Sequence, residues 1–221
     1  MRTVIFDLDG TLADTGADLL AAANACFRSL GHGDVLRLDT DKGTALRGGK
    51  AMLTLGFTRL GIAPEPTLLA RHYPLLLRHY GENINVHTRF YPGAEDAVKR
   101  LTGRGYKVGI CTNKPVALAE TLLHSMGARD WFGALLGADS LAVRKPDPLH
   151  FTETVRLCGG DPARALLVGD TVTDHDTARA AGVPSVLVSF GMGDTDVRAL
   201  NPDALLHRYD DLQGVVEGLI G

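Results

Sequence analysis

The sequence predicts an α/β fold, in which a doubly wound parallel sheet forms the core and an α-helical domain is inserted into it. Three observations support this prediction. Short apolar runs alternate with segments of helical spacing, each run is followed directly by polar residues, and one long early stretch has helical patterns without a convincing strand. Runs that are apolar throughout are typical of strands in a parallel sheet that is covered on both faces.

The strands of this sheet are expected at the apolar runs. These are Thr3 to Leu8, Lys107 to Thr112, Ala165 to Gly169 and Ser185 to Ser189, with a short edge strand near Ala204 to His207. Helices are expected over Gly93 to Gly103, Pro115 to Met126 and Pro148 to Cys158, and a further helix closes the chain. Such an alternation winds by right-handed crossovers into a Rossmann-like sheet, whose ligands lie at the carboxyl ends of the strands.

The stretch from residue 16 to residue 89 interrupts this alternation. Its apolar residues follow helical spacing over Asp18 to Leu30, Lys50 to Leu60 and Pro66 to Tyr80. Tyr91-Pro92-Gly93 then marks a turn back into the alternating pattern. We therefore expect a core of residues 1–15 and 90–221 and an inserted α-helical domain of residues 16–89.

The composition is that of an ordinary globular protein. The 221 residues include 45% hydrophobic and 22% charged residues, with a net charge of -3. No basic stripe is present, so we expect no nucleic-acid partner. The first apolar run is too short for a signal peptide or a membrane span, so we expect no membrane partner and a cytoplasmic location. The three cysteines lie far apart, which disfavours a disulfide framework or a structural zinc site.

Three carboxylates follow the first predicted strand in the stretch FDLDGTLADT, at Asp7, Asp9 and Asp14. Asp14 or Thr15 directly precedes the first predicted helix and is expected to cap its N-terminus. Asp7 and Asp9 precede the Gly10-Thr11 turn, and two neighbouring carboxylates repel each other unless a cation or a proton lies between them. This strand end therefore indicates a metal site, with a cluster of capping residues as the alternative.

Polar residues also follow two later strands. Thr112 and Asn113 come after the second, Asp170 and Asp174 come after the third, and Lys145 lies between them in the chain. The carboxyl ends of parallel strands share one edge of a sheet, so these residues are expected to converge on Asp7 and Asp9. Carboxylates beside a lysine and hydroxyl donors describe a Mg²⁺ site next to a phosphate site.

Simpler interpretations stay open for some of these residues. Asn113 is of a type that commonly shapes turns, and Lys145 has the alternative of an ordinary surface lysine. Asp174 has the alternative, or the additional role, of capping the helix that runs to Ala181.

Four motifs together resemble the haloacid dehalogenase superfamily, in its branch with a helical cap inserted after the first strand. Within that branch the chain is similar to phosphoglycolate phosphatase-like enzymes. The motifs, in chain order, are Asp7-Leu8-Asp9-Gly10-Thr11, Thr112-Asn113-Lys114, Lys145-Pro146, and Gly169-Asp170 through Asp174. Each is weak alone, but all four occur in order at a strand end or the following turn. The resemblance covers nearly the whole chain and implies that residues 16–89 are the cap.

The resemblance implies a role for each matching residue. Asp7 is the nucleophile that forms an aspartyl-phosphate, and Asp9 protonates the leaving alcohol and later activates water. Magnesium is held by Asp7, the backbone carbonyl of Asp9 and Asp170, while Asp174 orders the metal's waters or the lysine. Thr112 and Asn113 bind the phosphoryl oxygens, and Lys145 offsets their charge.

The inserted domain contains one further candidate, the loop Arg47-Gly48-Gly49-Lys50. Glycines beside two cations suit a loop that approaches an anionic substrate, and caps of this family supply specificity residues from such a loop. A turn between helices with solvated charges is the alternative. Arg47 is favoured slightly over Lys50, because a guanidinium binds a carboxylate through two hydrogen bonds.

The resemblance implies a Mg²⁺-dependent phosphatase of a small phosphorylated metabolite, with 2-phosphoglycolate as the favoured substrate. A sugar-phosphate phosphatase or a phosphomutase of the same fold stays an alternative, and a catalytically silent binding module is less favoured because all the acids are present. Asp9 argues against dehalogenase and phosphonate chemistry, although Lys50 keeps the latter open. A monomer and a homodimer are equally compatible with the sequence.

Overall fold

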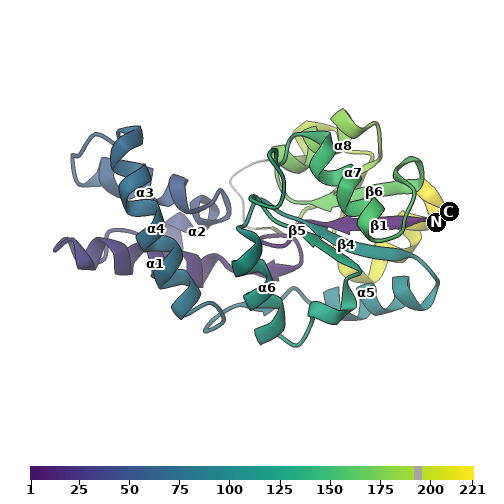
Figure 1. Cartoon of the computed structure of the whole chain (residues 1–221), viewed down its shortest axis with the longest axis horizontal. Coiled ribbons are helices and arrows are strands. Elements are labelled where there is room, and N and C mark those ends of the chain that lie inside the picture. The colour runs from purple at the N-terminus through teal and green to yellow at the C-terminus, as the bar shows by residue number, and fades with distance from the viewer. Residues whose placement is uncertain (192–195) are drawn as a thin grey trace. The chain divides into compact units, whose positions relative to one another are not determined.

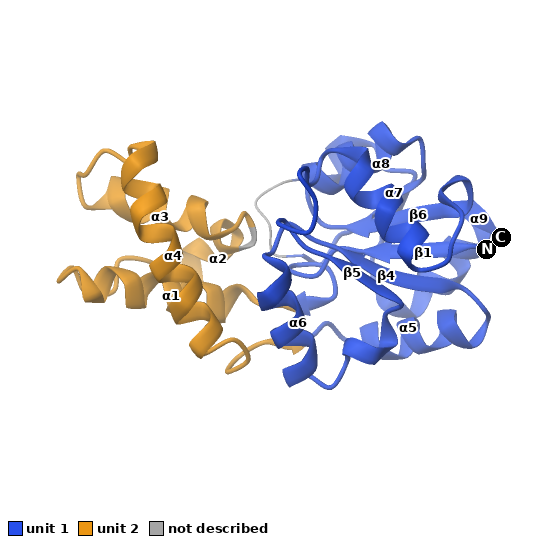
Figure 2. Ribbon diagram, viewed as in Figure 1, with its two compact units in different colours: residues 1–13, 90–191, 195–221 blue, residues 14–89, 192–194 orange. Residues whose placement is uncertain are grey.

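The computed structural model describes residues 1–191 and 196–221, which form two compact units (Figure 2). One unit contains residues 1–13, 90–191 and 196–221, and the other contains residues 14–89. The first boundary lies within a short strand between Ala13 and Asp14, two residues before the predicted start of the inserted domain. In the described part of the chain, no helix combines the length and the apolar character needed to cross a bilayer.

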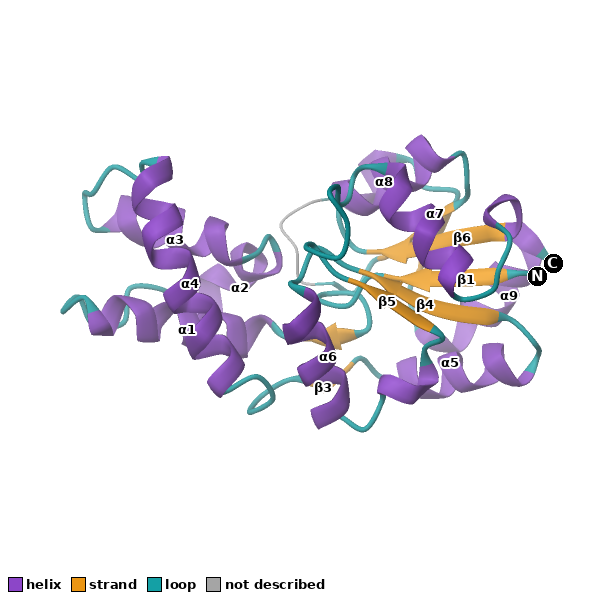
Figure 3. Cartoon of the chain, viewed as in Figure 1, coloured by secondary structure: helices purple, strands orange, loops and turns teal. Residues whose placement is uncertain are grey.

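The first unit is built on a sheet of six parallel strands in the order β5-β4-β1-β6-β7-β8 (Figures 1 and 3). Its strands are β1 (Thr3–Phe6), β4 (Lys107–Cys111), β5 (Ala134–Leu136), β6 (Ala165–Gly169), β7 (Ser185–Val188) and β8 (Ala204–Leu206). Its helices are α5 (Ala94–Gly103), α6 (Val116–Ser125), α7 (Pro148–Leu157), α8 (Val172–Ala181) and α9 (Leu212–Ile220). This confirms the predicted α/β fold.

The core of this unit lies between the sheet and its helices. The side chains of β1 and β6 are buried along both strands, because α7 and α8 pack on one face and α5 and α9 on the other. Short 3₁₀ turns complete the unit at Arg129–Trp131, Pro162–Arg164, Val197–Leu200 and Tyr209–Asp211. Burial of apolar side chains on both faces is the main force that holds such a sheet together.

The second unit is helical, with α1 (Gly16–Ser29), α2 (Leu38–Leu46), α3 (Gly49–Arg59) and α4 (Pro66–Glu82). Phe27 of α1 packs edge-to-face on Phe57 of α3, with ring centroids 5.2 Å apart. A β-carbon at Gly56 would lie 2.1 Å from the Phe27 ring, so this contact requires a glycine. Arg59 donates to both oxygens of the Asp41 carboxylate, at 2.5 and 2.6 Å, and so joins α3 to α2.

The two chain connections between the units pair as a small sheet of β2 (Ala13–Asp14) and β3 (Arg89–Phe90). Just inside the helical unit, the buried carboxylate of Asp18 accepts hydrogen bonds from the backbone N–H groups of Val86, His87 and Thr88. The start of α1 is thereby fastened to the segment that leaves the unit. This carboxylate therefore accepts hydrogen bonds from three backbone N–H groups that have no partner within a helix or a sheet.

Several local predictions differ from the structure. The strand predicted over Thr3 to Leu8 ends at Phe6, because the carbonyl of Leu8 already accepts from Leu12 and Ala13 in the following turn. Strand β5 and helix α2 were absent from the prediction, since β5 has three residues and α2 is polar with no clear apolar stripe. Thr15 occupies the N-cap position of α1 but makes no capping side-chain bond. Asp14 instead pairs with Lys42 at 2.6 Å and contacts the backbone N–H of Gly16 only at 3.4 Å.

Candidate active site

The register of the sheet brings the two acidic strand ends together. Phe6 of β1 pairs with Val168 of β6, and the backbone N–H of Asp7 donates to the Val168 carbonyl at 2.9 Å. Asp7 directly follows the last residue of β1, Phe6, and Asp170 directly follows the last residue of β6, Gly169. The predicted convergence at the carboxyl edge of the sheet is therefore present for these two acids.

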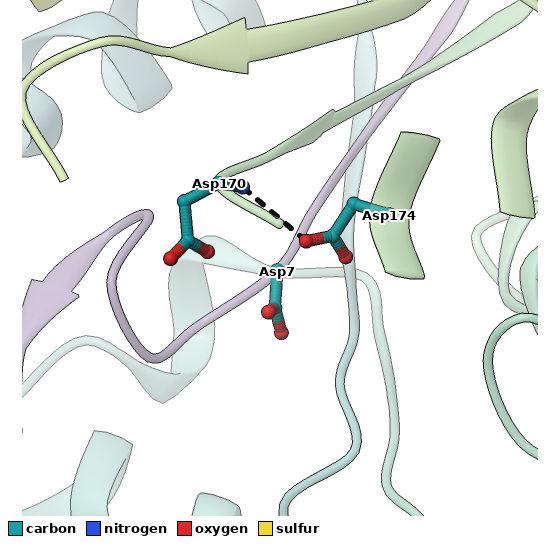
Figure 4. A group of neighbouring side chains, drawn as sticks. All are labelled: Asp7, Asp170 and Asp174. Carbon is teal, nitrogen blue, oxygen red and sulfur yellow. Dashed lines mark hydrogen bonds between the residues drawn. The ribbon is translucent and has the colours of Figure 1, made fainter. Parts of the chain in front are cut away.

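A buried cluster of three carboxylates results. Asp7, Asp170 and Asp174 each place a side-chain oxygen within 4.8 Å of the others, and they are 9%, 4% and 1% exposed. Figure 4 shows the Asp7 and Asp170 side chains on the two strand ends and Asp174 on the first turn of α8. Burial of several like charges is unfavourable unless cations or protons offset them.

Asp174 is the member of this cluster whose oxygens are already engaged. Its Oδ2 accepts from the backbone N–H of Asp170 and of Thr171 and from the Thr171 hydroxyl. Thr171 in turn caps α8 in a capping box, in which Asp174 is the third helical residue. The proposed alternative that Asp174 itself is the N-cap is therefore wrong. Asp174 instead completes the capping box through Oδ2, and its Oδ1 accepts a hydrogen bond from Lys145.

Lys145 supplies the positive charge of the cluster. Its buried Nζ lies 2.5 Å from Asp174 Oδ1 and 3.1 Å from Asp7 Oδ1. Burial alone would lower the pKa of Lys145, but the carboxylates of Asp174 and Asp7 outweigh burial and raise the pKa. The side chain stays a cation, and the alternative of a surface lysine is wrong, since Lys145 is 3% exposed.

Among the residues that the structure describes, two buried carboxylate oxygens of the cluster have no hydrogen-bond donor, namely Asp7 Oδ1 and Asp170 Oδ2. Asp7 Oδ1 is close to Lys145 but is not aligned for a hydrogen bond. Burial raises the pKa of Asp7 to about 6. The carboxylates of Asp174 and Asp9 also raise this pKa, and the positive charge of Lys145 opposes the rise. Burial, and then the carboxylates of Asp174 and Asp7, raise the pKa of Asp170. Three carboxylates and one ammonium leave a net negative charge, and the two bare oxygens fit a small divalent cation.

The Gly10-Thr11 turn shapes this site. Gly10 has a φ of +81°, and a β-carbon there would lie 2.3 Å from Asp170 Oδ2, so the close approach requires glycine. The Thr11 hydroxyl donates to Asp170 Oδ1 at 2.8 Å. Thr11 had no predicted role, although its place after the two acids could have indicated one.

The carboxylate of Asp9 has a partner that the sequence reasoning missed. Lys114, 6% exposed, donates from Nζ to both Asp9 oxygens, at 2.8 and 3.0 Å. Lys114 directly follows Thr112 and Asn113, so its place in the motif was a usable signal. A bidentate contact to a buried ammonium keeps the Asp9 side chain in one orientation.

Thr112 and Asn113 follow β4 at the same edge of the sheet. Thr112 is buried, and its hydroxyl accepts from the backbone N–H of Lys114. The side-chain amide of Asn113 donates to the backbone carbonyl of Lys145 at 3.0 Å. In this structure the Asn113 side chain therefore holds the Lys145 loop, and its predicted contact with phosphoryl oxygens stays a prediction.

Arg47 and Lys50 lie in the helical unit. Arg47 is exposed and ends α2, and Lys50 is exposed in the first turn of α3, after Gly48 with a φ of +91°. The Lys50 ammonium lies 5.5 Å from the centroid of the Tyr73 ring, a cation–π contact. That contact gives Lys50 a local partner within the helical unit.

Comparison with known proteins places this chain in a family. A sequence model of haloacid dehalogenase-like hydrolases matches residues 1–182. A phosphoglycolate phosphatase of Mesorhizobium japonicum is 43% identical over 95% of this chain and 92% of its own length. Another, from Caulobacter vibrioides, is 37% identical over 95% of this chain and 88% of its own length.

The fold has solved counterparts as well. The crystal structure of a predicted phosphoglycolate phosphatase from Haemophilus somnus matches with a TM-score of 0.86, covering 97% of both chains at 23% identity. CbbY from Rhodobacter sphaeroides, solved in complex with phosphate, matches with a TM-score of 0.77 over 96% of both chains at 22% identity. With its matching sequence over most of its length and its acids at the strand ends, this chain belongs to the haloacid dehalogenase-like hydrolase family.

Proposed function

We propose that this protein is a Mg²⁺-dependent phosphatase of 2-phosphoglycolate that works through an aspartyl-phosphate on Asp7. Its family is one of hydrolases and its named relatives are phosphoglycolate phosphatases, so the protein is a phosphoric monoester hydrolase. The choice of 2-phosphoglycolate rests on the names of relatives that share up to 43% of aligned residues. The observation that supports the mechanism is the buried cluster of Asp7, Asp170 and Asp174 with Lys145.

Asp7 and Asp9 divide the chemistry between them in this proposal. The Asp7 carboxylate attacks phosphorus, the ester P–O bond breaks, and Asp9 gives its proton to the departing alkoxide. Asp9 then takes a proton from water as that water attacks phosphorus. This second attack releases inorganic phosphate and restores Asp7. Lys145, 3.1 Å from Asp7, offsets negative charge on the transferring group.

Asp7, Asp170 and the backbone carbonyl of Asp9 would hold Mg²⁺, and Asp174 would keep Lys145 and the β6–α8 turn in place. The bare oxygens of Asp7 and Asp170 fit this assignment, whereas the Asp174 oxygens are engaged elsewhere. When bound, Mg²⁺ would neutralise the cluster and the phosphoryl oxygens.

Metal removal tests this assignment. With EDTA, release of phosphate from p-nitrophenyl phosphate is expected to stop, and excess Mg²⁺ is expected to restore it. Mg²⁺ at about 100 times its Kd should also raise the free energy of unfolding by about 2.7 kcal/mol. Asp170→Asn should lose most of that stabilisation. Full activity in EDTA, or equal stabilisation of Asp170→Asn and wild type, would remove the metal from the proposal.

The substrate is tested by a panel of phosphate esters ranked by kcat/KM. 2-Phosphoglycolate is expected to rank first, ahead of sugar phosphates and p-nitrophenyl phosphate. A sugar phosphate in first place would replace the proposed substrate and leave the reaction type intact. Transfer of the phosphoryl group between two positions of one sugar would instead indicate a mutase.

We also propose that residues 16–89 act as a cap that selects the substrate, with Arg47 and then Lys50 as candidates for binding its carboxylate. Arg47 is an exposed residue, and a guanidinium can bind a carboxylate through two hydrogen bonds. Arg47→Ala is expected to raise KM for 2-phosphoglycolate about 10-fold and KM for p-nitrophenyl phosphate less than 2-fold. Arg37→Ala, which removes an exposed arginine that pairs with Asp39, is the control. Equal changes in both KM values would exclude Arg47 from specificity.

A further inference from the structure

His150 is a buried histidine that no step of the proposed reaction uses. It lies in the first turn of α7 and is 0% exposed. The loop of residues 137–147, which contains Lys145, connects β5 to α7. The His150 ring bonds to this loop at two places, so it closes the loop in which the lysine of the acidic cluster stands.

Each ring nitrogen of His150 meets a backbone group of fixed character. Nδ1 is 3.3 Å from the backbone nitrogen of Lys145, and Nε2 is 3.0 Å from the carbonyl oxygen of Gly137. A backbone N–H can only donate and a carbonyl can only accept. Both contacts are therefore satisfied by one neutral tautomer, in which Nε2 carries the proton and Nδ1 is the acceptor.

The surroundings keep the ring in this neutral form. Burial, and then the positive charge of Lys145, lower the pKa of His150 to about 4. These two effects outweigh the Gly137 carbonyl and the Asp147 carboxylate, which raise the pKa. At neutral pH the ring has no charge, and its acceptor nitrogen is available to Lys145.

The backbone of Lys145 is consequently held at both of its polar groups. Its N–H donates to His150, and its carbonyl accepts from the Asn113 amide at 3.0 Å. From this anchored position the side chain reaches Asp174 at 2.5 Å and Asp7 at 3.1 Å. A lysine side chain has four rotatable bonds, so the placement of its ammonium depends on where its backbone is held.

We infer that His150 is a positioning residue for phosphoryl transfer, whose neutral imidazole fixes the backbone of Lys145 and thereby the ammonium against Asp7. This inference rests on the proposed function, in which Lys145 acts on the transferring phosphoryl group. It predicts that the contact from Nδ1 to Lys145 matters for turnover, whereas the contact from Nε2 to Gly137 matters mainly for stability.

Two conservative variants separate these contacts. Asparagine places its Oδ1 near the position of the imidazole Nδ1, so His150→Asn keeps an acceptor for the Lys145 N–H and loses the bond to Gly137. Glutamine places its amide nitrogen near the position of Nε2, so His150→Gln keeps a donor for Gly137 and loses the acceptor. Phe151→Leu is the matched control, because Phe151 is the next residue of α7 and packs in the apolar cluster with Ile5 and Cys111.

The expected result is a split between turnover and stability. With p-nitrophenyl phosphate and excess Mg²⁺, at a temperature where all variants are folded, His150→Gln should lower kcat about 10- to 100-fold, with KM within about 3-fold. His150→Asn should keep kcat within about 5-fold of wild type, and Phe151→Leu should keep it despite lower stability. If His150→Gln keeps wild-type kcat, or if kcat of all three variants simply follows their stability, the inference is wrong.

A double-mutant cycle with Lys145→Met tests whether His150 acts through the lysine. In the Lys145→Met background, His150→Gln should change kcat less than 2-fold, since the group that it positions is gone. An undiminished effect in that background would overturn the inference.

Nitrogen NMR shifts of the His150 ring in the wild type give a test that needs no variant to fold. They should show the Nε2-protonated neutral tautomer from pH 8 to pH 6, and the other tautomer or a charged ring would contradict it.

These outcomes are distinguishable from failure of the proposed function. A wild-type protein that hydrolyses no ester of the panel would remove both proposals together. An active wild type in which His150→Gln and His150→Asn behave alike would remove only the positioning role of His150.

Discussion

Asp7→Asn is expected to lower kcat for every phosphate ester by about 10⁴-fold or more, because an amide cannot attack phosphorus. Acid-quenched turnover of the wild type should leave a phosphoryl group on the peptide that contains Asp7, and the variant should show none. Asp14→Asn is the matched control from the same ten-residue stretch. Asp14 pairs with Lys42 in the helical unit, so kcat should stay within about 2-fold of wild type. Substantial activity of Asp7→Asn would overturn the mechanism.

The same variant should be more stable than the wild type in the absence of metal. Burial and neighbouring acids raise the folded-state pKa of Asp7 to about 6, above its usual value, so folding disfavours the ionised form. The penalty is complete above about pH 6, fades as pH falls through 6, and is gone below about pH 4. We expect a gain of up to about 3 kcal/mol at pH 7, which urea unfolding at pH 7 and pH 4 would measure. A loss of stability at pH 7 would contradict this account of the cluster.

Lys145→Met is expected to produce the largest loss of stability, together with a fall in kcat of about 10²- to 10³-fold. Methionine keeps the unbranched side chain as far as Cε but leaves the buried carboxylates of Asp174 and Asp7 without their cation. Removing one partner of a buried ion pair typically costs about 3–5 kcal/mol, which urea unfolding would detect.

The control for this prediction is Lys99→Met, the same substitution in an exposed pair with Glu95. That pair should contribute no more than about 0.5 kcal/mol. Equal stabilities of the two variants would show that the Lys145 pair contributes nothing beyond a surface contact.

The convergence of Asp7 and Asp170 could be predicted from the sequence for a physical reason. Both follow strands that are apolar along their length, and such strands are neighbours in a buried parallel sheet. The chain leaves both strands at the carboxyl edge of the sheet. Acids at these two positions therefore lie close together, independently of how the side chains around them pack. The same reasoning placed Thr112 and Lys145 near the acids.

Side-chain partners within the site could not be predicted in this way. The contacts of Lys114 with Asp9 and of Asn113 with the Lys145 carbonyl depend on rotamers and on the path of one loop. A pattern of residue types does not encode such a path. Likewise, His150 in the apolar face of α7 is indistinguishable in sequence from any buried histidine until its two backbone partners are known.

The sequence did not predict strand β5 and helix α2, because their residues show no clear pattern of apolar and polar positions. The three residues of β5 are held in the sheet by pairing with β4, not by a pattern of their own. Helix α2 has the sequence LDTDKGTAL, and its neighbours stabilise it through contacts such as the Asp41 pair with Arg59. In both elements tertiary contacts decide the structure.

The pairing of β2 with β3 makes the helical insertion an exchangeable module. The chain enters and leaves residues 14–89 through two hydrogen-bonded neighbours, and Asp18 fastens the segments just inside. The parallel sheet therefore needs from the insertion only two adjacent attachment points. Lengthening, shortening or replacing the helices between them leaves the register of β1 and β6 unchanged. Under the proposal that the insertion selects the substrate, this architecture lets the choice of substrate change while the acids at the strand ends stay in place.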